Sequence, residues 1–221
     1  MRILAASDIH GKHGFYASLL RAVKPLGAGA IVLAGDLLGY APGFDKAEDA
    51  QRADARVILR RLETSSVPVL YIMGNDDLFD WKPGPGPVRP IHGIRHELGP
   101  YNFVGYRYSL PFMGGPFEKS EEEIGRDLGV MTRLTDEHTV FITHSPAKGI
   151  LDRTMLHSHA GSVSILDFIE KTGVRAHIHG HIHSGFGREG RHFNVAVLPG
   201  AKAMLIDLDR MEHRLVGLTE E

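Results

Sequence analysis

The sequence predicts an α/β fold with a parallel sheet in its first half, because apolar runs alternate there with amphipathic segments. The apolar runs that predict strands are Arg2–Ser7, Ala30–Ala34 and Val67–Met73. Between them, Phe15–Lys24 and Asp45–Glu63 carry apolar residues at three- and four-residue intervals, which predicts two helices, the first ending at Pro25. A β-α-β-α-β series of this kind folds with right-handed crossovers into a parallel sheet.

The second half predicts a further sheet with helices outside it. Strands are expected at Tyr101–Tyr108, Thr139–Thr143 and Ala176–His179. Helices are expected at Glu118–Leu128, where acidic residues favour the helix start, and at Val163–Glu170. The closing antiparallel meander is expected to use Phe193–Leu198, Ala203–Asp207 and His213–Val216. Lys82–Pro90 is rich in proline and glycine, so we expect a loop without ladder hydrogen bonds. Residues 1–221 are interpreted as one domain.

Composition narrows the class of protein. The chain has 221 residues, 43% of them apolar, which suits a globular fold with a real core. A net charge of −2 gives no nucleic-acid footprint, so a nucleic-acid partner is not expected. The lack of cysteine excludes disulfides and thiolate metal sites. No run is long enough for a signal-peptide core or a membrane span, so we expect a cytoplasmic protein without a membrane partner.

Five short polar blocks follow apolar runs, and they carry the chemistry of the chain. The blocks are Asp8-Ile9-His10, Gly35-Asp36, Gly74-Asn75-Asp76-Asp77, Thr143-His144 and Gly180-His181-Ile182-His183. Ligands of open α/β sheets gather beyond the carboxyl ends of the strands, where these blocks are predicted to lie. With Asp76 and Asp77 set aside, the blocks supply two carboxylates, one amide and four imidazoles. This donor set suits two divalent cations, with manganese first and iron, zinc or nickel as alternatives.

Two adjacent cations point to phosphate ester chemistry. Ions ~3.5–4 Å apart can hold a bridging hydroxide and grip two phosphate oxygens. A carboxylate such as Asp36 can bridge the ions, and Asn75 offers a neutral oxygen. Two dications, two aspartates and a hydroxide leave a positive centre, which a phosphodiester monoanion brings close to neutrality. The sequence therefore predicts hydrolysis of a small phosphate ester, and of a phosphodiester in particular.

The blocks resemble the signature of the calcineurin-like metallophosphoesterase superfamily, which reads D-x-H, G-D, G-N-H-[DE], a histidine, and G-H-x-H. Four of the five blocks match without change. The similarity covers roughly residues 1–200 and extends to a branch of predicted prokaryotic phosphoesterases. The further segments that carry it are Phe103–Tyr106, Pro116–Glu123, His144–Pro146 and Leu151–Thr154.

The resemblance implies a fold and a ligand set. The implied fold is a four-layer α-β-β-α sandwich, in which two mixed sheets lie face to face with helices on both outer sides. The implied ligands of one metal are Asp8, His10, Asp36 and His183. The implied ligands of the second metal are Asp36, Asn75, His144 and His181.

The third block departs from the family at Asp76, which stands where the family has histidine. In the family that histidine is thought to contact the phosphate and to help protonate the leaving group. Asp36, Asn75 and Asp76 are the candidate catalytic residues, but two nearby dications would lower the pKa of Asp76 and make it a poor acid. We therefore expect slow hydrolysis that favours good leaving groups. His13 and His159 are candidates for a replacement acid.

Simpler readings compete at several positions. Asp76 and Asp77 could form an Asx turn or a helix cap. His177 and His179 alternate on one strand and are interpreted as packed rather than ligating. The histidines expected at the surface are His92, His96, His138, His157, His192 and His213.

The predicted enzymatic function also has an alternative. A non-catalytic interaction scaffold on the same fold is the alternative to an enzyme, but eroded ligands would mark it, and all seven positions are intact. A nuclease would call for a basic groove, of which the balanced charge gives no sign. Pocket walls are expected from the loops Phe79–Pro90 and Leu110–Phe117, and Lys82–Pro90 is either a substrate lid or an ordinary connection.

Overall fold

Two six-stranded sheets form the centre of the computed structural model, which describes residues 1–39 and 46–220. The first sheet has the order β12-β11-β1-β2-β3-β4. Its strands are β1 (Arg2–Ala6), β2 (Ala30–Ala34), β3 (Val69–Ile72), β4 (Val88–Pro90), β11 (Lys202–Asp207) and β12 (Glu212–Gly217). Strands β1 to β4 run parallel, as the βαβ pattern predicts, whereas β11 and β12 pair antiparallel at the other edge.

The second sheet has the order β5-β6-β7-β8-β10-β9. Its strands are β5 (Arg95–Leu98), β6 (Tyr101–Tyr106), β7 (Thr139–Thr143), β8 (Ala176–His179), β9 (Gly187–Glu189) and β10 (His192–Asn194). The four central strands are parallel, and the short edge strands β5 and β9 pair antiparallel. Both sheets are therefore mixed.

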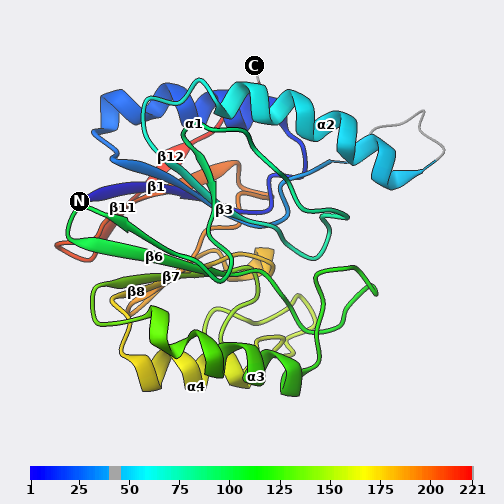
Figure 1. The fold of residues 1–221 in the computed structure, drawn as a ribbon, viewed down its shortest axis with the longest axis vertical. Helices are drawn as coiled ribbons and strands as arrows, with labels where there is room; N and C mark the ends of the chain where they lie inside the picture. Colours follow the sequence, from blue (N-terminus) through cyan, green and yellow to red (C-terminus); the bar gives the residue numbers. More distant parts are fainter. Residues whose placement is uncertain (40–45, 221) are drawn as a thin grey trace.

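Helices cover the outer face of each sheet, which gives the predicted four-layer α-β-β-α sandwich (Figure 1). The helices are α1 (His13–Leu26), α2 (Ala47–Leu62), α3 (Glu121–Met131) and α4 (Val163–Thr172), with short 3-10 turns at Thr132–Leu134 and His183–Gly185. Helices α1 and α2 lie on the first sheet, and α3 and α4 lie on the second (Figure 1). The predicted start of α2 at Asp45 lies outside the described residues.

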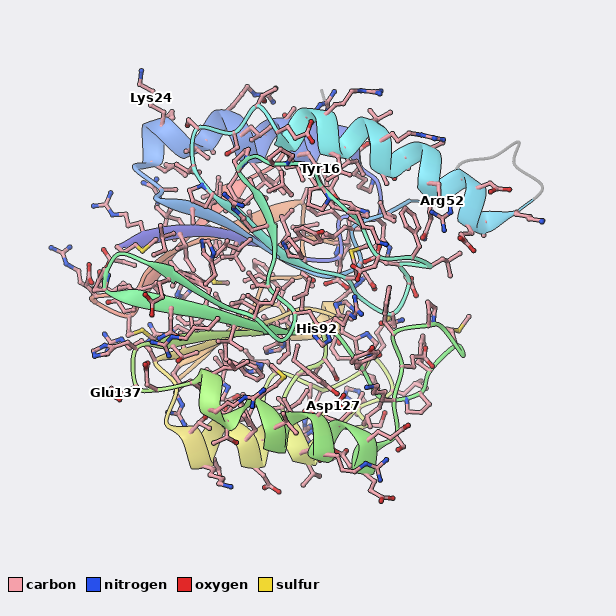
Figure 2. All side chains as sticks on the ribbon, in the orientation of Figure 1. Tyr16, Lys24, Arg52, His92, Asp127 and Glu137 are labelled. Carbon is pink, nitrogen blue, oxygen red and sulfur yellow. The ribbon has the colours of Figure 1, made fainter. Side chains whose placement is uncertain are left out.

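Three apolar layers hold these elements together. Side chains such as Ile3 and Phe103 fill the space between the two sheets. Tyr16 points from α1 toward the first sheet, whereas Lys24 on the same helix extends away from it (Figure 2). The Tyr16 hydroxyl also donates to the carbonyl of Leu37 at 2.6 Å, directly after the Gly35-Asp36 block. Packing of α1 therefore helps to fix the turn that carries Asp36.

Helix α3 starts later than the sequence predicts. Ser120 and Glu123 form a capping box, in which the Ser120 hydroxyl accepts from the Glu123 N–H and the Glu123 carboxylate accepts from the Ser120 N–H. The predicted start at Glu118 is therefore wrong by three residues, because the helix begins at the capping box. Glu118 instead binds the preceding loop.

The prediction that Lys82–Pro90 lacks ladder hydrogen bonds is wrong at its end. Val88–Pro90 forms β4, which pairs parallel with β3 at the edge of the first sheet. An edge position explains how a strand that ends in proline is tolerated, because the missing N–H can face away from the ladder.

The predicted C-terminal meander is wrong in its first strand, whereas its other two strands pair antiparallel as predicted. Phe193 lies in β10, which belongs to the second sheet and runs parallel to β8. The chain then crosses between the sheets, where Ser7 donates to the Val195 carbonyl at 3.0 Å and Val197 donates to the Ser7 carbonyl at 2.9 Å. Of the three predicted strands, the second and third correspond to β11 and β12, which form a hairpin, and β11 pairs with β1 of the first sheet. Strand β1 is buried from Ile3 to Ala6 and has a neighbour on each side, and the C-terminal hairpin supplies the second one.

Candidate metal centre

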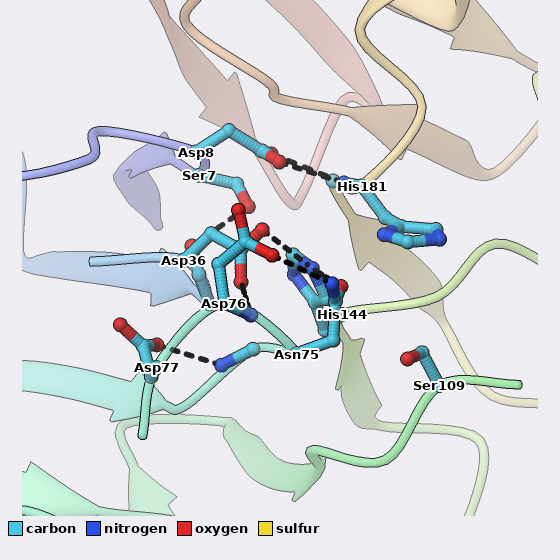
Figure 3. Close-up of polar contacts among 12 residues, drawn as sticks. Ser7, Asp8, Asp36, Asn75, Asp76, Asp77, Ser109, His144 and His181 are labelled. Atoms are coloured by element: carbon cyan, nitrogen blue, oxygen red, sulfur yellow. Dashed lines mark hydrogen bonds and ion pairs between the residues drawn. The ribbon is translucent and has the colours of Figure 1, made fainter. Parts of the chain in front are cut away.

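The carboxyl ends of five parallel strands converge at one edge of the sandwich. Strands β1, β2 and β3 of the first sheet lead to Asp8, Asp36 and Asn75, and strands β7 and β8 of the second lead to His144 and His181 (Figure 3). All seven predicted ligand residues lie in this region: Asp8, His10, Asp36, Asn75, His144, His181 and His183. The topology thus brings together side chains that are separated by up to 175 positions in the sequence.

The first of two ligand groups contains Asp8, His10 and His183. One ligand atom from each lies within 4.8 Å of the others. The His183 Nε2 is 3.2 Å from Asp8 Oδ1, and the His10 and His183 rings are 5.9 Å apart. Asp8 is buried and also accepts from the His181 N–H at 3.1 Å, so its carboxylate is fixed in direction.

The second group contains Asp36, His144 and His181, with ligand atoms again within 4.8 Å of one another. The His144 Nε2 lies 3.2 Å from Asp36 Oδ2 and 3.0 Å from Asn75 Oδ1. The other ring nitrogen, Nδ1, donates to the Ala34 carbonyl at 2.9 Å, which orients the ring as outer partners of metal-binding histidines do. Asp36 Oδ2 is also 4.0 Å from His10 Nε2, so Asp36 lies between the two groups.

Two glycines allow the close packing of these groups. A Cβ at Gly74 would lie 2.2 Å from Asp36 Oδ1, and a Cβ at Gly180 would lie 2.3 Å from Asp8 Oδ2. Both contacts are shorter than any side chain can accept. The glycines in the Gly-Asn and Gly-His blocks are therefore required by the carboxylates of other strands.

Backbone strain is concentrated at the same residues. Asp8, His10, Asp36 and His181 have positive φ angles of 56°, 46°, 51° and 66°. Such left-handed conformations cost roughly 1–3 kcal/mol each in a non-glycine residue and cluster at functional sites. Four of the seven predicted ligands are thus held in a conformation that their own preferences disfavour, which indicates that their directions matter.

Charges in the site are strongly coupled. Burial opposes ionisation of Asp8 and Asp36, yet their histidine neighbours hold the pKa of both carboxyls below the usual value. Burial likewise opposes protonation of His144, but the Asp36 carboxylate raises its pKa to about 10. Burial and His144 lower the pKa of His181 to about 4. Without a cation, a proton on His144 therefore balances the carboxylates, and a bound cation would take over that role.

Asp76 lies within the site rather than in a simple cap. Its Oδ2 is 3.8 Å from His10 Nδ1, and it forms a third possible metal group with His10 and Asp36. Its Oδ1 accepts from the Asn75 side-chain amide at 2.9 Å, and its backbone N–H donates to Asp36 Oδ1 at 2.9 Å. Burial and the Asp36 carboxylate raise the pKa of Asp76 when no cation is present, whereas two dications would reverse that effect.

Asp77 fits the turn-forming reading. Its buried carboxylate accepts from the backbone N–H groups of Leu37, Leu38 and Gly74 at 2.8 to 3.0 Å (Figure 3). It thereby ties the turn after β2 to the turn after β3. Burial and Asp36 raise the pKa of Asp77 to about 8.

The two candidate acids lie in different surroundings. His13 is paired with Asp54, and both line a cavity of about 450 Å³ that His10 also lines. His159 is 2.5 Å from Asp152, which also accepts from the Gly161 N–H within the loop after β7. His13 therefore adjoins the predicted ligands through this cavity.

The histidines outside the blocks differ from expectation at one position. His177 and His179 are buried and stacked on each other at 4.9 Å, which confirms their packed role. His138, His157 and His213 are exposed as predicted, and His92 and His96 are half-buried. The surface prediction is wrong for His192, which is buried because β10 pairs with β8 and places it against His177.

Sequence reasoning missed two residues beside the site. The Phe112 ring lies 6.0 Å from the His181 ring, and Glu118 holds the Phe112 loop in place. The expectation that Leu110–Phe117 forms a pocket wall was the available signal, but no residue spacing singled out either side chain.

Comparisons with known proteins agree with this geometry. The model of the calcineurin-like phosphoesterase family matches residues 1–185. TT1561 of Thermus thermophilus has a TM-score of 0.72 at 17% identity, over 98% of each chain. A dimetal phosphatase from Danio rerio has a TM-score of 0.60 at 10% identity, over 99% of each chain. An archaeal phosphodiesterase has a TM-score of 0.52 at 13% identity, over 99% of this chain and 100% of the other.

At these identities the solved structures show the shared fold alone. No curated protein matches the sequence significantly. Within residues 1–39 and 46–220, none of the helices combines the length and apolarity needed to cross a bilayer. The family model covers most of the chain, and the matched range contains the converging carboxylates and imidazoles. The chain belongs to the calcineurin-like phosphoesterase family and is a metal-dependent phosphoester hydrolase.

Proposed function

We propose that the protein hydrolyses phosphodiesters with the help of two divalent cations. The residues proposed for one cation are Asp8, His10, Asp36 and His183. Those proposed for the other are Asp36, Asn75, His144 and His181. The observation that carries the proposal is the position of Asp36, whose Oδ2 lies 3.2 Å from His144 Nε2 and 4.0 Å from His10 Nε2. One carboxylate can therefore serve both groups.

The donor atoms suit such cations. Carboxylate and imidazole ligands fit manganese, iron, zinc and nickel, and we propose manganese as the native metal. When bound, paired divalent cations supply an activated water and neutralise the phosphate oxygens. The chain itself orients the donors, because the Ala34 carbonyl fixes the His144 ring and the His181 N–H fixes Asp8.

Charge favours a diester over a monoester. Two dications, Asp8, Asp36 and a hydroxide leave one positive charge, which a diester monoanion would neutralise. Asp76 adds a further carboxylate close to His10. A monoester dianion would therefore meet more repulsion than a diester monoanion, and we propose a small phosphodiester as the substrate. The absence of cysteine supports a reducing, cytoplasmic location.

The leaving group is where Asp76 matters. General acid catalysis contributes roughly 10²–10⁴-fold when an acid with a suitable pKa is in place. Asp76 stays ionised beside two dications and supplies no such proton. The protein is therefore expected to be slow on diesters whose leaving group is a poor one.

A series of aryl methyl phosphodiesters with different leaving-group pKa values tests the function. Manganese-loaded protein should hydrolyse them, with a rate that falls steeply as the leaving-group pKa rises. A rate that hardly changes along the series would show that another group donates the proton. Protein that binds two cations but hydrolyses none of the esters would favour the interaction scaffold instead.

A further inference from the structure

The loop between β6 and α3 places an exposed aromatic side chain beside the metal centre. The Phe112 ring meets the His181 ring edge-on, with centroids 6.0 Å apart and planes at 88°. Phe112 is nevertheless 71% exposed, and its neighbour Met113 is 75% exposed. Apart from this edge-on contact, the two adjacent apolar side chains form an exposed patch beside the predicted ligands, which a bound apolar group would cover.

The loop is held firmly although its tip is exposed. The Glu118 carboxylate accepts from the backbone N–H groups of Phe112, Met113 and Gly114 at 2.8, 2.8 and 2.9 Å. Partial burial opposes ionisation of Glu118, yet these hydrogen bonds hold its pKa below the usual value. An ionised carboxylate thus fixes the backbone that carries Phe112, so the ring has a defined place without packing in the core.

The base of the loop also adjoins the site. Ser109 donates to the Phe117 carbonyl at 3.1 Å and accepts from the Lys119 N–H at 2.9 Å, which closes the loop. Ser109 appears in the same close-up as the ligand residues (Figure 3). A Cβ at Gly115 would lie 2.6 Å from the Asn75 carbonyl oxygen. The loop therefore follows the ligands of the second proposed cation, with Asn75 near its base and His181 near its tip.

We propose that Phe112 is a specificity-determining residue that contacts a planar aromatic substituent of the substrate. This inference rests on the proposed function, because the phosphate must bind the metal centre for the substituent to reach the loop. A flat ring can lie against Phe112 in an offset or edge-on arrangement, the favoured geometries of aromatic pairs. The substrate class is then a phosphodiester with an aryl or nucleoside group, and Glu118 is a positioning residue that holds the platform.

Three phosphonate monoesters test the proposal by binding to manganese-loaded protein in a calorimeter. Each is a monoanion in which a P–C bond replaces one ester bond of the diester, and the remaining ester has a poor alkoxide leaving group. Methyl methylphosphonate carries the anion alone, methyl phenylphosphonate adds a ring, and the thymidine 5′-ester of methylphosphonic acid adds a nucleoside. Wild-type protein should bind the two ring-bearing compounds more tightly than the first. Stronger binding of the thymidine ester than of the phenyl compound would assign a nucleoside substrate, and the reverse would assign a simple aryl group.

Substitutions in the loop test whether Phe112 is responsible for the tighter binding of ring-bearing compounds. Phe112→Leu should weaken the binding of both ring-bearing compounds about three- to tenfold, which is the size of one aromatic contact. The affinity for methyl methylphosphonate should change by less than about twofold. Phe112→Tyr keeps the ring and should bind as wild type does. Glu118→Gln should reproduce part of the ring-specific loss. Val130→Ala removes a remote exposed apolar side chain on α3 and should leave all three affinities unchanged.

The binding experiment separates a failure of the Phe112 proposal from a failure of the proposed function. Equal binding of all three compounds by wild type and Phe112→Leu would overturn the role of Phe112 and leave the phosphate site intact. Binding of none of them by metal-loaded wild type would instead contradict the proposed function. Metal content measured on each variant shows whether His181 still has its role, so that a general loss is recognised as such.

Discussion

Two groups of histidines arise from one run of sequence, and they have opposite surroundings. In the run from His177 to His183, every second residue is a histidine, with Gly180 at the centre. The first pair, His177 and His179, lies on β8 and is fully buried. The second pair, His181 and His183, follows the strand end and adjoins the carboxylate of Asp8.

The buried group is held neutral. The His177 Nε2 is 2.8 Å from the Thr143 hydroxyl, and its Nδ1 is 3.1 Å from His192 Nδ1. Burial lowers the pKa of His179 to about 3 and of His192 to about 4, and it lowers the pKa of His177 strongly. These imidazoles therefore act as packed, hydrogen-bonded core side chains.

The site group has carboxylate partners that come from the other sheet. The hydrogen bond with Asp8 raises the pKa of His183, whereas burial and His144 lower that of His181. His144, which joins this pair from the end of β7, has its pKa raised by Asp36 despite burial. The turn at Gly180 makes this possible, because only a glycine can pass so close to Asp8. The carboxylates of the opposite sheet, rather than the spacing of the histidines, therefore decide which imidazoles are available to a cation.

The largest expected effect is that of removing the shared carboxylate. Asp36→Asn should lower the hydrolysis of an aryl phosphodiester by at least about 100-fold, more than loss of an outer-shell partner costs. Metal content should fall from two ions to at most one, because Asp36 serves both groups. Elemental analysis and steady-state kinetics measure both quantities. His177→Asn is the matched control and should retain two ions; full activity of Asp36→Asn would contradict the assignment.

The buried group should respond in stability instead. His177→Phe removes the hydrogen-bond partner of the His192 ring and one of the two partners of the Thr143 hydroxyl, so the free energy of unfolding should fall by about 2 kcal/mol. Denaturant titration followed by fluorescence of the buried Trp81 measures the change. Metal stoichiometry should stay at two. Loss of a metal ion in the folded variant would mean that the two groups are not separate.

Adding a histidine to the site group tests the role of Asp76. Asp76→His should raise the rate about tenfold on diesters with poor leaving groups, equivalent to about 1.4 kcal/mol, because an imidazolium can donate the proton. The rate on diesters with good leaving groups should change far less. Kinetics on the two ends of the aryl ester series provide the measurement, and Asp76→Asn separates the added acid from the lost charge. An equal gain in rate on diesters with poor and with good leaving groups would show that loss of the Asp76 charge, rather than an added acid, causes the gain.

The smallest expected effect is the contribution of His192 to the loss of stability at acidic pH. His192 has a folded pKa of about 4 against about 6.5 in the unfolded chain, so the unfolded state takes up a proton first as the pH falls. Well above pH 6.5, His192 is neutral in both states and does not affect the free energy of unfolding. As the pH falls from 6.5 toward 4, protonation of His192 in the unfolded chain destabilises the folded protein increasingly. Between pH 7 and pH 6, His192→Gln should reduce the loss of unfolding free energy by about 0.7 kcal/mol. His138→Asn, at an exposed histidine, should leave the pH dependence as in wild type.

Much of the first sheet and the convergence of the polar blocks could be predicted from the sequence. The strand Ala30–Ala34 and the block at Asp36 are local features, because a buried run followed by a polar turn is visible without any tertiary partner. The same is true of Thr139–Thr143 and His144.

Other features depend on partners far away in the chain. The sheet to which Phe193 belongs is decided by pairing with β8, and the burial of His192 follows from that choice. The position of Phe112 depends on Glu118, whose acidic side chain in the sequence resembles an ordinary helix start. The positive φ angle of Asp36 and the close approach of its carboxylate to Gly74 are equally invisible in the sequence.

The central claim is that Asp36 joins two cation sites at the edge shared by the two sheets. Crystals grown with manganese, measured at the manganese absorption edge, test it most directly. Two anomalous peaks ~3.5–4 Å apart are expected on either side of the Asp36 carboxylate, one near His183 and one near His144. A single peak, or peaks beside His177 and His192 instead, would contradict the account.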